Sequence, residues 1–110
     1  QWFIADPELG LGRDAADLAA SLWDLDGWAA AAIDLRRRMH SLIGRLEGGD
    51  TEALAPGFVL SAAVLRHFVA DPLLPVELQP RRWPGAALRG DYDRYDRAYR
   101  ALLAQWYAQA

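Results

Sequence analysis

The sequence contains no cysteine and no lysine, and its 110 residues include only two histidines. The absence of cysteine excludes disulfide bonds, thiolate catalysis and zinc–thiolate sites, and it suits a reducing compartment, so we expect a cytoplasmic protein. Two histidines, His40 and His67, without a set of carboxylates placed around them predict no metal site and no cofactor. No uninterrupted apolar run of about 18 residues occurs, so we expect no membrane span.

All basic residues are arginines, and 12 of them against 15 acidic residues give a net charge of −3. Nucleic-acid affinity comes mainly from the neutralisation of backbone phosphates, so a domain of this charge is a poor DNA binder by itself. The serines lack the glycine context of a nucleophile elbow, and no glycine-rich phosphate loop occurs. The acid-rich run 91–96 is interleaved with arginines, which predicts a solvated helix face. These observations predict that the domain is not an enzyme.

The spacing of apolar residues predicts an all-α fold. Residues 1–12 contain Pro7 and two glycines, and we expect a strand remnant and linker from a missing preceding domain, followed by a helical domain at 13–110. A short helix is predicted from Asp14 to about Trp23. Two longer helices each show an apolar stripe with steps of 4, 3, 4, 3 and 4 residues. The stripes are Trp28, Ala32, Leu35, Met39, Leu42 and Leu46, and Leu88, Tyr92, Tyr95, Tyr99, Leu102 and Trp106.

A further helix, between these two, is expected to reach Ala70. It is apolar on almost every side from Phe58 to Leu65, which predicts that it is the central helix of the bundle. Pro56 and Gly57 either kink this helix or mark its start. The predicted architecture is a compact bundle of three main helices plus the short N-terminal helix, with a proline-rich strap before the last helix.

The strap is the segment DPLLPVELQPRRWPG, residues 71–85, which holds four of the six prolines. Each proline fixes φ, lacks a backbone donor and keeps the preceding residue out of the α region. The apolar side chains in the segment predict that it packs across the bundle, with Leu74, Leu78 and Trp83 inserted. We expect Arg66 to tie it down through Asp71, Glu77 or backbone carbonyls of the segment, because a charge near the end of so apolar a helix needs a partner.

This segment resembles the C-terminal domain of PaaX-like transcriptional regulators. In that family an arginine-containing helix end is followed by a D-P-x-L-P-x-E-L-L-P-x-x-W-x-G pattern and a final helix, and an L-W-D sequence, here residues 22–24, opens the region. The order of elements agrees over about residues 14–107. Besides Arg66, the matching motif residues are Asp71, Pro72, Leu74, Pro75, Glu77, Leu78, Pro80, Trp83 and Gly85.

The resemblance implies a role in a bacterial repressor of aromatic-acid catabolism of the phenylacetate type. In such proteins an N-terminal winged helix, absent from this sequence, binds DNA, and the inducer is an aryl-CoA thioester such as phenylacetyl-CoA. We expect an effector-sensing and oligomerisation domain that forms a homodimer. The alternative is a structural module that only dimerises or docks on other domains, without a ligand of its own.

The candidate ligand-binding residues are Trp23, Trp28, Arg66, His67 and Trp83. For Arg66 and His67 a purely structural role remains open. The candidate interface residues are Tyr92, Tyr95, Tyr99 and Trp106, since a tyrosine can bury its ring in a core and still present its hydroxyl to water.

Overall fold

The computed structural model describes residues 15, 17, 18 and 24–109, and these contain helices and no strand. Three long helices form the body of the molecule, and two short 3-10 helices lie in the connections. In chain order the elements are α2 (Leu25–Glu47), η3 (Thr51–Ala53), α3 (Leu54–Val69), η4 (Val76–Leu78) and α4 (Gly85–Gln109). The prediction of an all-α bundle with three main helices is confirmed.

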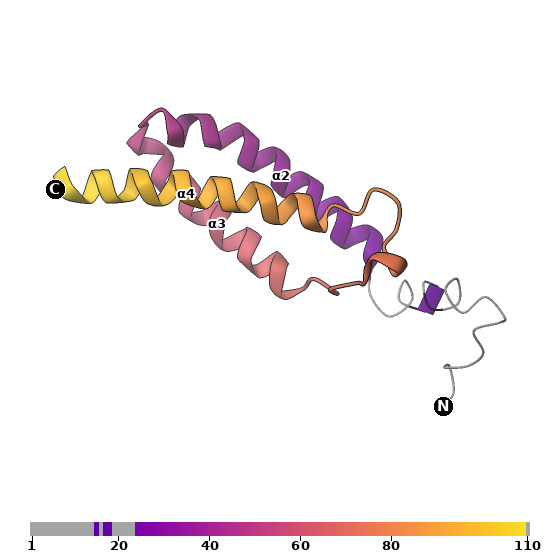
Figure 1. Cartoon of the computed structure of the whole chain (residues 1–110). Coiled ribbons are helices and arrows are strands. Elements are labelled where there is room, and N and C mark those ends of the chain that lie inside the picture. Colours follow the sequence, from indigo (N-terminus) through magenta and orange to yellow (C-terminus); the bar gives the residue numbers. More distant parts are fainter. Residues whose placement is uncertain (1–14, 16, 19–23, 110) are drawn as a thin grey trace.

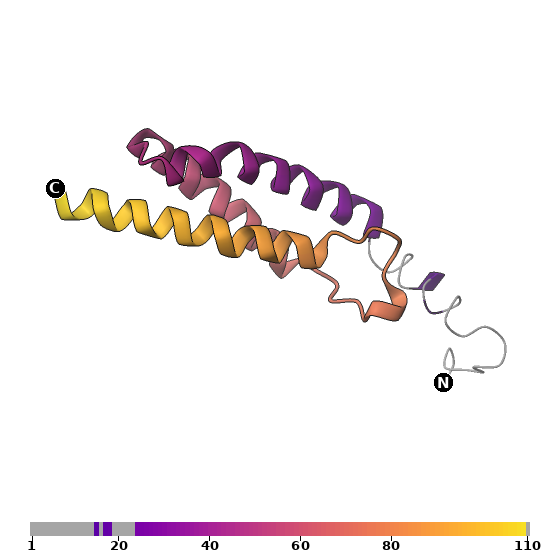
Figure 2. The same cartoon turned by 45° about the horizontal axis from the view of Figure 1, so that its top comes forward.

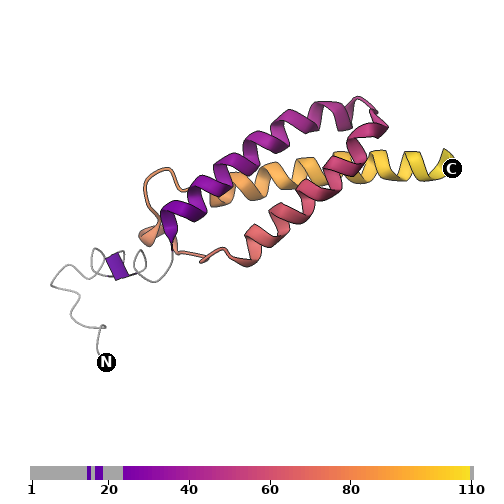
Figure 3. The same ribbon diagram turned by 180° about the vertical axis from the view of Figure 1, so that it is seen from behind.

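Helices α2 and α4 lie side by side along the bundle, and α3 crosses against them (Figures 1 and 2). The N-terminus of α2, the C-terminus of α3 and the N-terminus of α4 meet at one end. At the opposite end, α4 projects past the turn between α2 and α3 (Figure 3). The main core contains most members of both predicted stripes. Its largest fully buried side chains are Tyr95, Met39, Leu88 and Val64.

Local signals in the sequence set the boundaries of α2. The Asp24 side chain caps its N-terminus by accepting a hydrogen bond from the backbone N–H of Gly27 at 2.9 Å. At the other end, Gly48 is the C-cap, and Gly49 follows with a φ of +84°, a conformation that glycine adopts without steric cost. The helix therefore ends at the glycine pair.

The start of α3 resolves the alternatives left open for Pro56 and Gly57. Pro56 lies in the first turn of the helix, where its missing N–H would have no intrahelical acceptor. Gly57 is buried, and a Cβ there would lie 3.2 Å from the Tyr99 ring. This close approach lets the hydroxyl of Tyr95 donate to the Gly57 carbonyl at 2.7 Å. The pair marks the start of the helix and its contact with α4.

The prediction that α3 is the central helix is wrong. Its inward face packs through Gly57, Leu60 and Val64, but the outward face is exposed and also apolar. Phe58 is 64% exposed and Val69 is 88% exposed. A helix that is apolar all round was expected to be covered on several sides, and here only one side is covered. The main contact of the bundle is that between α2 and α4.

Among the residues described, the stretch Thr51–Val69 is the one that is long and apolar enough to cross a membrane by length and composition. The prediction of no membrane span rested on uninterrupted apolar runs, which is a stricter test. Core helices of soluble proteins also satisfy the looser criterion. Length and composition alone therefore assign no membrane to this helix.

The proline-rich connector, residues 70–84, joins α3 to α4 without regular structure apart from η4. Leu74 is buried against Leu25 of α2 in a small second core, and Leu78 and Trp83 pack beside them. Two non-glycine residues of the connector, Leu73 and Arg82, have positive φ values of 54° and 60°. Such conformations cost free energy and persist where surrounding contacts fix the backbone.

Several predictions concern residues that lie mostly or wholly outside the described part of the chain. The strand remnant and linker at 1–12 and the ligand candidate Trp23 are among them. Of the short helix predicted from Asp14 to about Trp23, the described residues Ala15, Asp17 and Leu18 are helical. The helix itself and the boundary at residue 13 stay predictions.

Candidate functional site

Trp28 and His67 form a reciprocal pair that ties the first turns of α2 to the last turn of α3. The indole Nε1 of Trp28 donates to the His67 carbonyl at 3.1 Å, and His67 Nε2 donates to the Trp28 carbonyl at 2.9 Å. The two rings also stack, with centroids 4.3 Å apart and planes inclined by 15°. Because a carbonyl can only accept, His67 carries a proton on Nε2, and its Nδ1 takes no part in the pair.

Trp83 of the connector stacks on the same indole. Its ring centroid lies 5.0 Å from that of Trp28, with an interplanar angle of 17°. Trp28 therefore stacks with both His67 and Trp83. Three separate segments thus contribute to one aromatic stack, which we call the aromatic cluster (Trp28, His67 and Trp83). Three of the five predicted ligand-binding residues are together here.

Asp71 anchors the connector beside this cluster. Its side chain is only 2% exposed and pairs with Arg89 of α4, while the Leu73 N–H donates to its carboxylate at 2.8 Å. Arg89 also lies over the ring of Phe68, 5.6 Å from the guanidinium carbon to the centroid. A charge this deeply buried is retained only with a partner, and Arg89 supplies it.

The prediction that Arg66 ties the connector down is therefore wrong. Arg66 is exposed, on the outward side of α3, and forms no hydrogen bond or ion pair with any residue that the structure describes. Helix geometry explains the difference, since Arg66 lies about 120° around α3 from Leu60 and about 160° from Val64, both of which are on the inward face. Arg89 is the site residue that sequence reasoning missed. The sequence contained a signal for Arg89, because this residue lies on the first turns of the helix that follows the motif and is therefore close to the connector.

Two hollows border the aromatic cluster. One has a volume of about 320 Å³ and the other of about 240 Å³. The first is lined by Asp24, Gly27, Trp28, His67, Ala70 and Pro72. The second is lined by Asp71, Leu73, Leu74, Gln79, Trp83, Ala86 and Arg89. Both are open to solvent and lie where the connector meets the helices.

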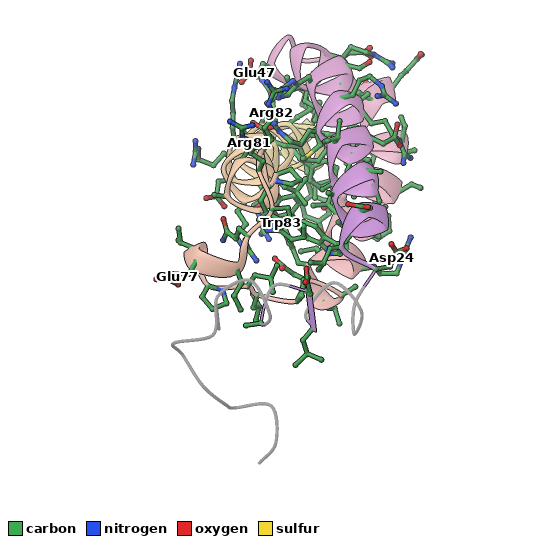
Figure 4. All side chains as sticks on the ribbon, turned by 90° about the vertical axis from the view of Figure 1, so that its right-hand side faces the viewer. Asp24, Glu47, Glu77, Arg81, Arg82 and Trp83 are labelled. Atoms are coloured by element: carbon green, nitrogen blue, oxygen red, sulfur yellow. The ribbon has the colours of Figure 1, made fainter. Side chains whose placement is uncertain are left out.

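Positive charge stands close to the cluster in the sequence. Arg81 and Arg82 precede Trp83 directly, and both are exposed without an ion-pair partner among the described residues. Figure 4 views this end of the molecule and shows Trp83 toward its middle, with Glu77 and Asp24 on its two sides. Of the remaining motif residues, Pro72 is half-buried, Gly85 is buried, and Pro75, Glu77 and Pro80 are exposed.

The predicted interface row is mostly internal. Tyr95 has no exposed surface, which corrects its assignment, because a fully buried side chain cannot contact a partner. Burial raises the pKa of Tyr95 to about 12, with smaller contributions from Tyr99 and Tyr92. Tyr92 and Tyr99 are half-buried against the core, and Tyr92 shares a hydrogen bond with Ser61 at 3.1 Å. Of the row, only Trp106 is exposed.

The described residues contain no group of three or more His, Cys, Asp or Glu side chains that could hold a metal ion. The outer face of the bundle is instead held by ion pairs. Asp91 accepts from Arg36 at 2.6 Å and from His40 at 2.9 Å, which links α4 to α2. This acidic residue of the run 91–96 is thus paired with α2 as well as solvated.

The fold and the site define a small helical domain in which an aromatic stack joins the proline-rich connector to α2 and α3. The model of the PaaX-like protein C-terminal domain family matches residues 23–109, which is most of the chain. The chain belongs to this family, which the resemblance of the proline motif had indicated. The family is one of transcription regulators, not of enzymes. Comparison with curated proteins and with solved structures gives no significant match.

Proposed function

We propose that this chain is the effector-sensing and oligomerisation domain of a cytoplasmic repressor of phenylacetate-type catabolism, and that it responds to an aryl-CoA thioester such as phenylacetyl-CoA. Family membership supports the regulatory role. The observation that supports ligand sensing is the aromatic cluster with its adjoining hollow of about 320 Å³. DNA contact would be made by the winged helix of the whole regulator, outside this chain.

The chemistry of the cluster matches the two ends of such a ligand. An aryl ring gains from contact with apolar and aromatic residues, and Trp28, His67 and Pro72 line the hollow. The hollow has room for the ring and the thioester arm but not for a whole CoA thioester. The phosphates of the nucleotide end would lie on the surface, where Arg81 and Arg82 offer guanidinium groups with no competing carboxylate.

The position of the hollow gives a ligand a way to act on the rest of the regulator. Residues from α2, α3 and the connector line it, and α2 begins at Leu25, directly after the segment that leads in from the rest of the chain. A ligand shifts a conformational equilibrium only through different affinities for the two states. A ligand that contacts three separate segments binds with a different affinity when the arrangement of these segments changes.

Calorimetric titration of the chain with phenylacetyl-CoA, with CoA and phenylacetate as controls, tests the proposal. We expect saturable binding of the thioester, and weaker or no binding of either half. The double substitution Arg81→Ala with Arg82→Ala should lower affinity by about tenfold or more, since charge-assisted hydrogen bonds to phosphate are lost. Arg97→Ala is the matched control, because Arg97 is also exposed and without an ion pair among the described residues.

The substitution Ala70→Phe provides a second test by filling the hollow beside Trp28. Ala70 is exposed and lines the hollow, so a larger side chain there should leave the fold intact and exclude the aryl ring. Binding that survives both changes would place the ligand elsewhere. No binding of the thioester at all would favour the alternative, a structural module that dimerises or docks on neighbouring domains without a ligand of its own.

A further inference from the structure

The outward face of α3 carries an apolar stripe that the bundle does not use. Its members follow one another in steps of 3, 4, 3 and 4 residues, on the side of the helix opposite to Leu60 and Val64. We call them the α3 stripe: Ala55, Phe58, Ala62, Leu65 and Val69. Steps of this kind are the pattern of a helix that packs against another helix along its length.

An apolar groove continues the α3 stripe at the end of the bundle where α4 projects. It has a volume of about 340 Å³. Its lining residues are Thr51, Leu54, Ala55, Phe58, Tyr99, Leu103 and Trp106. The stripe and the groove together expose on the order of 700 Å² of apolar side chain, taking aromatic side chains at roughly 150–250 Å² each. A standard interface buries about 800 Å² per partner, so this surface is of the size that a stable dimer needs.

We propose that two copies of this chain associate through the α3 stripe, with the two α3 helices antiparallel about a twofold axis at Ala62. The inference rests on the oligomerisation part of the proposed function. Of the predicted interface row it keeps Tyr99 and Trp106, which line the groove. In this register residues whose numbers sum to 124 lie at the same level. Ala62 then faces its own counterpart, and a small residue at the axis lets the two helices approach closely.

The same register matches the two ends of the surface to each other. Val69, which is 88% exposed, lies seven residues from the axis, and so does Ala55 at the edge of the groove. Each Val69 would therefore enter the groove of the other copy, beside Trp106. Such self-complementarity is the property of a twofold interface. Arg66, which has no ion pair among the described residues, falls at the level of the partner's Phe58, where a cation–π contact can form.

Charge and position favour a second copy over other occupants. No acidic residue occurs between Glu52 and Asp71. Two copies of the stripe therefore bring no carboxylates together that would repel each other, and the stripe has no negative charge to attract a basic partner. The groove is lined by Thr51 and Leu54, which follow the turn between α2 and α3. This turn lies at the opposite end of the bundle from the start of α2 at Leu25 (Figures 1 and 3).

The test is the oligomeric state of the chain and of two matched variants, measured by light scattering from about 1 to about 100 μM, because interfaces of this size range from micromolar to tighter affinities. Leu65 is 48% exposed on the stripe, and Ile33 is 51% exposed on α2, away from it. We expect the parent chain to be a dimer. Leu65→Glu would bury an unpaired charge in the interface, so it should raise the dissociation constant of the dimer by about a hundredfold or more. Ile33→Glu should leave the dissociation constant unchanged.

The register is tested by disulfide formation, since the chain has no cysteine of its own. Ala62→Cys should oxidise readily to a covalent dimer, and Leu65→Glu in the same chain should prevent it. Ala30→Cys, on the exposed side of α2, should stay monomeric. A monomer at every concentration, a dimer unaffected by Leu65→Glu, or equal cross-linking from residue 30 would overturn the inference. Calorimetry with phenylacetyl-CoA on Leu65→Glu separates failure of the dimer from failure of ligand sensing.

Discussion

The ion pair between Asp71 and Arg89 predicts a clear difference between two arginine substitutions. Arg89→Ala removes the partner of a carboxylate whose side chain is 2% exposed, whereas Arg66→Ala removes an exposed side chain with no ion pair among the described residues. Both arginines lie on helices near the connector, and both become alanine. We expect the first change to lower the free energy of unfolding and the second to leave it nearly unchanged.

The magnitude for Arg89→Ala follows from three contributions. Losing a hydrogen bond to a charged group costs about 1.5–3 kcal/mol, and the lower part of that range applies because the Arg89 side chain is 45% exposed and partly screened. The lost contact with Phe68 adds about 0.5 kcal/mol. Removing a cation from the first turns of α4 returns a few tenths. The expected net loss is about 2 kcal/mol.

Urea unfolding measured by circular dichroism tests this expectation. With a slope of about 2 kcal/mol/M for a domain of this size, the midpoint for Arg89→Ala should fall by about 1 M. Arg66→Ala should stay within about 0.5 kcal/mol of the parent. A double-mutant cycle with Asp71→Asn should give a coupling of at least about 1 kcal/mol. Equal losses for the two arginine substitutions, or no coupling, would refute the assignment of Arg89 as the anchor.

Two further parts of the structure give predictions of stability. The Tyr95 hydroxyl donates to the Gly57 carbonyl, so Tyr95→Phe should cost about 1 kcal/mol at neutral pH by urea unfolding. Because the folded-state pKa of Tyr95 is raised from 10.0 to about 12, the unfolded chain loses this proton first, and stability should be complete below pH 10 and fall between pH 10 and 12. That loss of stability, up to about 2–3 kcal/mol from this group, should be absent in the phenylalanine variant. The same dependence of stability on pH in the parent and the variant would contradict the prediction. In Gly85→Ala, the new Cβ would lie 2.9 Å from Trp83 Nε1, so we expect a loss of about 1 kcal/mol and a changed near-ultraviolet circular dichroism spectrum. Gly90→Ala has no atom within 4 Å and should stabilise the chain by up to about 1 kcal/mol, so a similar response of both variants would count against the Trp83 contact.

The sequence indicated the two striped helices well because each has one apolar face. Trp28, Ala32, Leu35 and Met39 are buried, as their steps predict, and so are Leu88 and Tyr95. In such a helix the polar residues show which side faces water, and one burial pattern satisfies the whole segment. The glycine pair and Asp24 then set the boundaries of α2 through local hydrogen bonds that need no tertiary information.

The placement of α3 could not be obtained in this way. Both of its faces are apolar, so periodicity leaves the inward side undetermined, and the burial of Leu60 rather than Leu65 is decided by contacts with α2 and α4. The partner of Asp71 had the same ambiguity. Arg66 is closer in sequence, but only the crossing of the helices shows that Arg89 reaches the carboxylate. Pairings between elements depend on tertiary geometry that local patterns do not contain.

The two faces of α3 allow the proposed activities to be separated experimentally. His67 points inward, where its ring and backbone hold Trp28, while Leu65 and Val69 point outward. A substitution at Leu65 therefore leaves the aromatic cluster and its hollow in place, and one at Ala70 changes the hollow without touching the α3 stripe. If a ligand alters the position of α3 at the cluster, however, the outward face of the same rigid helix moves with it. Ligand binding and dimerisation would then be coupled, and by linkage each would change the equilibrium constant of the other by the same factor.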